Sequence, residues 1–119
     1  MINQYEIAGF IAGKLPLIKN DLQNCRSGNV YQPIQVLTEY TKRMAIGHDF
    51  KMVGKCMELA DKIYEKGNAN VRNAIENVFI FSFSSIMALY NIVEWRIAQS
   101  YMPSRLYVLY MQQVLRSKD

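Results

Sequence analysis

The sequence has few of the side chains from which most metal and catalytic sites are built. It contains one histidine, His48, and two cysteines, Cys25 and Cys56. Metal-binding cysteines and histidines usually occur in close pairs such as C-x₂₋₄-C or H-x₃₋₅-H, whereas these three residues are isolated from one another. A mixed site of all three is the alternative, but the spacing favours two reduced thiols and an exposed histidine at a helix joint.

A phosphate-binding loop is also missing. Gly9 and Gly13 share a segment with apolar residues at helical spacing, and no Gly-Lys-Ser/Thr ending follows them. Glu76 and Glu94 flank an apolar run, where a partly buried carboxylate can become a functional acid, although a structural role is the favoured interpretation. We therefore predict a protein that is not an enzyme, with no catalytic residue, cofactor or metal.

Signals for export and for membrane insertion are sparse as well. The start of the chain has an early acid, Glu6, and no basic segment, which together with unpaired cysteines predicts a cytoplasmic protein. No charged residue lies between Glu76 and Glu94. This run is at the short end of what spans a bilayer, about 17–25 residues, and it contains asparagines and serines. It predicts a buried helix, either continuous or broken near Ser84 and Ser85, and no membrane span.

Apolar residues are plentiful, in contrast. Half of the 119 residues are hydrophobic and 12% are aromatic. This composition is sufficient for a single helical domain over residues 1–119 with its own core. It also provides more apolar surface than a small monomer easily buries, which favours a protein partner or a homo-oligomer.

Prolines and glycines divide the chain into helices. Pro16, Pro33 and Pro103 each precede an apolar pattern of helical spacing, as expected for first-turn prolines. Gly47-His48-Asp49 and Gly67-Asn68 each combine a helix stop with a residue that can cap the next helix. We expect an all-α, compact bundle of about five to seven helices, with a central antiparallel three-helix unit over residues 33–83. The β-branched and aromatic stretch 106–111 has no second strand to pair with, so it also predicts a helix.

The charge pattern bears on nucleic-acid binding. The net charge is +4, which permits contact with nucleic acid, but acids and bases alternate along the chain, as in a solvated helix face. The alternative basic patch consists of Lys42, Arg43, Lys51 and Lys55. A second set of residues, near the end of the chain, interleaves aromatics with bases and suits a protein partner better than stacked bases. This possible partner surface consists of Trp95, Arg96, Tyr101, Arg105, Tyr107 and Tyr110.

Residues 37–83 contain Ala45-x-Gly47, Leu59-Ala60, Gly67-Asn68 and Val71-x-Asn73-Ala74-Ile75-x-Asn77-Val78-Phe79. In these motifs the chain resembles small uncharacterised bacterial helical domains of unknown function. The resemblance implies no catalytic or binding residues. Some similar families lie in toxin-immunity neighbourhoods, so it also implies an immunity-type inhibitor as one function, although such inhibitors are often acidic and this chain is basic.

Together these observations favour a non-enzymatic protein–protein interaction module or a self-associating helical domain. The alternatives are an immunity-type inhibitor and a basic helical regulator that binds nucleic acid.

Overall fold

The computed structural model describes residues 1–26 and 28–117, and these residues form an all-α bundle, as the sequence predicts. The elements in chain order are α1 (Ile7–Lys14), the 3₁₀ helix η1 (Pro16–Ile18), α2 (Lys19–Gln23), α3 (Tyr31–Ile46), α4 (Phe50–Lys66), α5 (Ala69–Ala74), the π-helix η2 (Ile75–Ile80), α6 (Phe83–Met87), α7 (Ile92–Ser100) and α8 (Ser104–Ser117).

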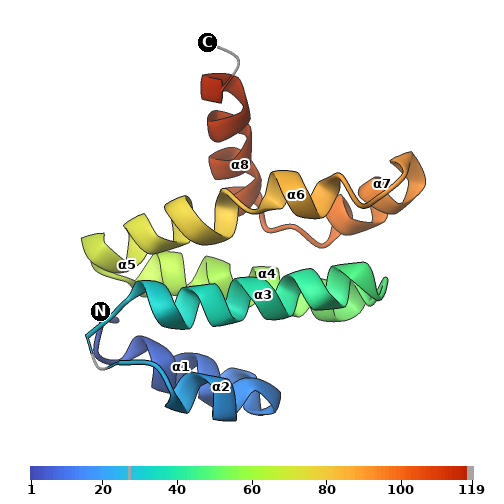
Figure 1. Ribbon diagram of the computed structural model, residues 1–119. Helices are drawn as coiled ribbons and strands as arrows, with labels where there is room; N and C mark the ends of the chain where they lie inside the picture. Colours follow the sequence, from blue (N-terminus) through green and yellow to red (C-terminus); the bar gives the residue numbers. More distant parts are fainter. Residues whose placement is uncertain (27, 118–119) are drawn as a thin grey trace.

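The helices lie in layers (Figure 1). Helices α1 and α2 form one outer layer, the antiparallel pair α3 and α4 forms the middle layer, and the run from α5 through η2 to α6 covers the opposite side. Helix α7 lies at one extremity of this third layer, and α8 projects away from it. The predicted three-helix unit is therefore present, with α3, α4 and the run from α5 to α6 as its members. Among the described residues, no helix combines the length and apolarity needed to cross a membrane.

The two short joints of this unit are built as the sequence predicts. Asp49 caps α4 by accepting a hydrogen bond from the Met52 N–H at 3.1 Å. Asn68 caps α5 in the same way, with 3.0 Å between its Oδ1 and the Val71 N. Each cap satisfies a backbone donor that the first turn of a helix leaves without a partner. Short capped joints hold successive helices antiparallel.

Gly67, at the second joint, is a point of very close packing. A Cβ atom there would lie 2.5 Å from Cγ1 of Val71 and 2.7 Å from the carbonyl oxygen of Ile63. The N-terminal segment also pairs at this joint, since the Ile2 N–H donates to the Lys66 carbonyl at 2.6 Å and the Asn68 N–H donates to the Ile2 carbonyl at 2.9 Å. The joint therefore holds α4 and α5 this close only because residue 67 has no side chain.

The charge-free run is interrupted twice. It starts in the π-helix η2, turns at Phe81–Ser82, continues as α6, turns again over 88–90 and enters α7 after Asn91. The Ser82 hydroxyl donates to the Val78 carbonyl at 2.8 Å, a local bond that competes with regular helix geometry. Of the two alternatives, a broken run is therefore the one observed, although the breaks lie at Phe81–Ser82 and over 88–90, and Ser84 and Ser85 themselves lie inside α6.

The expectation that the whole run is buried is also wrong in part. Phe79, Ile80, Phe83 and Ile86 are fully or almost fully buried in the core, and the rings of Phe79 and Phe83 meet edge to face at 5.1 Å. Phe81, in contrast, is 72% exposed. The residues at the end of the run are exposed too, and they belong to the surface described next.

Candidate interaction surface on helix α7

Helix α7 begins with a complete capping box. The Asn91 side chain accepts from the Glu94 N–H at 2.9 Å, and the Glu94 carboxylate accepts from the Asn91 N–H at 3.0 Å. This reciprocal pair satisfies two backbone donors at the start of the helix. Glu94, one of the two carboxylates singled out in the sequence, thus has the structural role that was favoured for it.

A second contact of Glu94 holds this end of α7 against the joint between α3 and α4. Its Oε2 lies 2.7 Å from Nε2 of His48, which has a left-handed backbone with φ of 58°. Residues other than glycine rarely adopt that backbone conformation. At this joint the imidazole of His48 is directed toward α7. The Tyr90 hydroxyl donates to the Ala45 carbonyl at 3.1 Å, and its ring packs against Phe50 at 5.2 Å between centroids. The joint histidine is exposed, as expected, but it is also the anchor for α7.

The other end of α7 is anchored on α4. The Tyr101 ring lies directly over Gly54, where an added Cβ would approach Cδ1 of the ring to 2.8 Å. Gly54 is thus the residue that allows the end of α7 to contact α4 closely.

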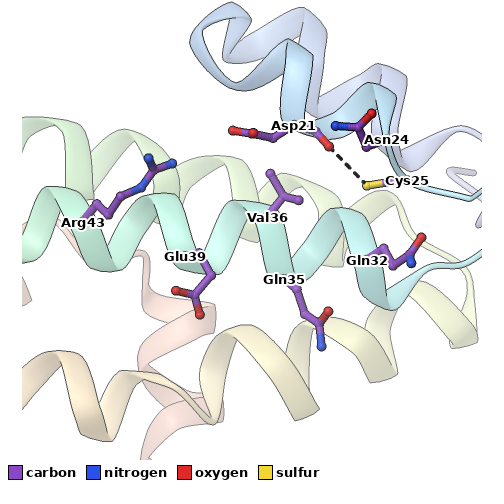
Figure 2. A pocket seen from close by; sticks show the side chains of 8 residues that line it. All are labelled: Asp21, Asn24, Cys25, Gln32, Gln35, Val36, Glu39 and Arg43. Carbon is purple, nitrogen blue, oxygen red and sulfur yellow. Dashed lines mark hydrogen bonds between the residues drawn. The ribbon is translucent and has the colours of Figure 1, made fainter.

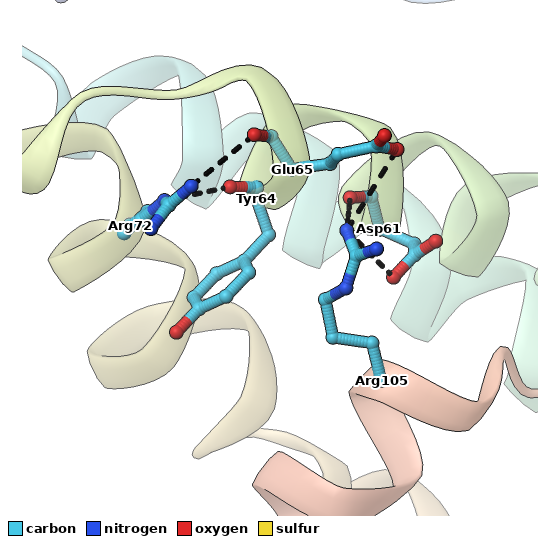
Figure 3. A network of polar contacts seen from close by, with 5 residues as sticks. All are labelled: Asp61, Tyr64, Glu65, Arg72 and Arg105. Carbon is cyan, nitrogen blue, oxygen red and sulfur yellow. Dashed lines mark hydrogen bonds and ion pairs between the residues drawn. The ribbon is translucent and has the colours of Figure 1, made fainter.

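Arg105, at the start of α8, binds α4 as well (Figure 3). Its guanidinium lies 3.8 Å from carboxylate oxygens of both Asp61 and Glu65, and it donates to the Asp61 carbonyl at 3.5 Å. In the same network Arg72 donates to the carbonyls of Tyr64 and Glu65 at 3.0 and 3.2 Å. Because the last carbonyls of a helix lack partners within it, Arg72 caps the C-terminal end of α4.

Between its two anchors, α7 exposes apolar side chains. Ala98 is the one residue of α7 that is buried, whereas α4 buries seven. Ile92, Val93 and Ile97 recur at spacings that place them on one side of a helix. They are 69%, 63% and 39% exposed, and Leu89, just before the helix, is 48% exposed. We call this set, Leu89, Ile92, Val93 and Ile97, the α7 face.

A shallow groove lies where the end of α7 meets the start of α8. The groove has a volume of about 220 Å³ and is lined by Gln99, Met102, Ser104, Tyr107 and Val108. Val108 is itself half exposed. Exposed apolar side chains are thus present on the projecting helix as well as on α7.

The six residues of the predicted partner surface have different environments. Tyr101 and Arg105 contact α4 as described, and Tyr110 packs on Phe83 at 6.0 Å between ring centroids. Trp95 and Tyr107 are half-buried, and Arg96 is exposed on the same side of α7 as the α7 face. Reasoning from aromatics and bases missed the aliphatic residues of the α7 face. Their signal was the apolar spacing from 89 to 97, which the sequence interpretation assigned to the core.

The four residues of the predicted basic patch are distributed over α3 and α4. Arg43 lines a groove of about 520 Å³ between α2 and α3, where Asp21 and Glu39 are also present (Figure 2). Lys55 lines another groove, of about 260 Å³, together with Lys14, Leu15, Glu58, Leu59 and Lys62. Lys51 is exposed and Lys42 is half-buried. In both grooves acids accompany the bases, whereas a phosphate-binding footprint clusters bases alone.

The thiols have the environments of unreactive cysteines. Cys56 is fully buried and Cys25 is half-buried, and burial raises the pKa of each thiol. At Cys25 the negative charge of Asp21 raises the pKa further. Among the described residues, no group of three or more His, Cys, Asp or Glu side chains is arranged to hold a metal ion.

Glu76 lies on η2 beside the base of α8. Its carbonyl accepts from the Gln113 side chain at 2.7 Å. The residue lines a cleft of about 510 Å³ with Asn73, Asn77, Phe81, Gln113 and Arg116. Glu76 and Glu94 are thus on different parts of the surface and do not form a carboxylate pair.

These features define a small all-α bundle with an apolar surface on helix α7. The family model described as "Domain of unknown function (DUF7674)" matches residues 10–116. The chain therefore belongs to this family, which confirms the predicted relationship to helical domains of unknown function and extends it beyond residues 37–83. Comparison with curated proteins and with solved structures gave no match.

Proposed function

We propose that the protein is a non-enzymatic protein–protein interaction module and that the α7 face is its contact surface. The observation that carries this proposal is the contrast within α7. The helix has a capping box and is anchored at both ends, yet three of its aliphatic side chains point to solvent.

A well-anchored helix with exposed aliphatic residues needs an explanation. Leaving an Ile or Val in water forgoes up to about 1.5–3 kcal/mol per side chain. Single exposed apolar residues are normal on protein surfaces, but a contiguous apolar patch commonly marks a binding site. The anchors fix the position of α7, so the surface requires little ordering when it binds, and this reduces the entropic cost of association.

The test compares two charge-introducing variants. Ile92→Glu changes the α7 face, and Leu17→Glu is the matched control, because Leu17 is 78% exposed on η1, the element between α1 and α2. Helices α1 and α2 form the outer layer opposite the one that contains α7. Tagged wild-type and variant proteins are expressed in the native host, and bound proteins are measured after nuclease treatment at low and high salt.

We expect a salt-resistant protein contact that Ile92→Glu removes and Leu17→Glu retains. The contact includes self-association, measured by the mass of the purified protein. If Ile92→Glu folds normally and keeps every contact of the wild type, the α7 face is not the contact surface. Binding only to nucleic acid, lost on nuclease treatment or at high salt, would support the basic-regulator alternative instead.

A further inference from the structure

We infer that the occupant of the α7 face is a second copy of this chain, in a two-fold symmetric dimer. This inference rests on the proposed function and names the partner for the same surface. It follows from the area, the charge and the position of the face.

The exposed apolar area of α7 and α8 together is comparable to the apolar part of one side of a dimer interface. Besides the α7 face, Tyr101, Val108 and Leu115 are between 43% and 59% exposed, and the seven-residue spacing of Val108 and Leu115 puts both on one side of α8. With about 60–120 Å² for a fully exposed aliphatic side chain and about 150–250 Å² for an aromatic one, the seven residues present roughly 260–500 Å² of apolar surface over the two helices. A standard interface takes about 800 Å² from each partner, slightly more than half of it apolar, or roughly 450 Å².

The charged side chains near the α7 face do not favour a strongly charged partner, because most of them are already paired within the chain. Glu94 is engaged by His48 and by its own capping box, and Arg105 is paired with acids of α4. Arg96 is the one charged residue on the exposed side of α7, between Val93 and Ile97. Its aliphatic stem can lie along apolar neighbours while the guanidinium extends to the rim of an interface. An aliphatic stripe with a single arginine is self-complementary when burial provides the driving force.

The position of α7 allows a second copy to approach. The helix lies at the extremity of the third layer (Figure 1), and the contacts that anchor it are with α4 and with the joint between α3 and α4. In a two-fold contact the same face of each copy meets the other, so every aliphatic side chain of the face contributes twice.

The test is the mass of the purified protein, measured by light scattering after size exclusion and by sedimentation equilibrium from about 1 to 100 μM, a range that brackets micromolar affinities. We expect a dimer of twice 13.8 kDa. Ile92→Glu should weaken association at least about 100-fold, since the change occurs twice in the interface. Leu17→Glu should leave the dimer unchanged. Val93→Glu is the second variant of the face, and circular dichroism verifies that each variant is folded.

The salt dependence of dimer formation distinguishes apolar burial from charge interactions as the source of the binding energy. Raising NaCl to about 1 M screens the two Arg96 side chains from each other, so a dimer through the α7 face persists or tightens. A wild type that is monomeric at about 100 μM at every salt concentration overturns the inference. A dimer that both face variants leave intact overturns it as well.

The same variants distinguish this inference from the proposed function. If the wild type is monomeric but Ile92→Glu loses a salt-resistant contact with another protein, the dimer inference is wrong and the proposed function as an interaction module is supported. If Ile92→Glu loses no contact of any kind, both proposals fail.

Discussion

Replacing Gly67 by alanine tests the packing of the joint between α4 and α5. The added Cβ would lie 2.5 Å from Cγ1 and 2.9 Å from Cβ of Val71, and 2.7 Å from the Ile63 carbonyl oxygen. Carbon atoms at rest in a protein pack at about 3.5–4.0 Å. Val71 is fully buried and the oxygen belongs to the backbone of α4, so neither can rotate away. The joint itself must open.

The expected cost follows from two opposing contributions. Overpacking of this kind costs typically about 1–3 kcal/mol. Gly67 has φ of −78° and ψ of 153°, which alanine adopts freely, so the variant regains about 0.4–1 kcal/mol from reduced entropy of the unfolded chain. We expect a net loss of about 1–2 kcal/mol in the free energy of unfolding, measured by urea titration followed by circular dichroism.

Gly9 provides the matched control. It lies inside α1, and an added Cβ there would meet no atom within 4 Å. Gly9→Ala should therefore stabilise the protein by about 0.5–1 kcal/mol. If Gly67→Ala is as stable as Gly9→Ala, the account of the joint is wrong.

Three further predictions concern the anchors, the caps and pH. Gly54→Ala should destabilise the protein because the added methyl group collides with the Tyr101 ring. Adding Tyr101→Gly should remove most of that cost, so a double-mutant cycle should give a coupling energy of about 1 kcal/mol or more. Additive effects of the two substitutions would contradict the contact. Asp49→Ala should lower the unfolding free energy by about 1 kcal/mol while Asp49→Asn keeps most of it, and equal losses in both variants would exclude a capping role. Burial raises the pKa of the Cys56 thiol, so the folded state holds its proton more tightly than the unfolded state does; the unfolding free energy should therefore fall as pH rises above the ordinary thiol pKa of about 8.5. Urea midpoints at a series of pH values should show a shallower fall for Cys56→Ala, and identical slopes would refute this assignment.

The parts of the fold that depend on neighbouring residues could be predicted from the sequence. Asp49 and Asn68 cap helices because each bonds a backbone N–H three residues ahead, a relation visible in the sequence. The apolar spacing of α4 likewise matches the face that it buries, which includes Cys56. The all-α class follows from these local signals.

The parts that depend on distant residues could not be predicted. The charge-free run turns at Phe81–Ser82, and its last aliphatic residues face solvent although their composition matches that of a core helix. Which side of α7 faces the bundle is decided by His48 and by Gly54, both far from it in sequence. Exposure of Ile92 and Val93 is therefore a consequence of tertiary contacts that apolar spacing alone does not reveal.

The most direct test of the account is sedimentation equilibrium of the wild type beside Ile92→Glu and Leu17→Glu. We predict a dimer for the wild type and for Leu17→Glu, persisting at high salt, and a folded monomer for Ile92→Glu. Equal masses for all three proteins, together with unchanged protein contacts of Ile92→Glu in the native host, would contradict the assignment of the α7 face as the contact surface.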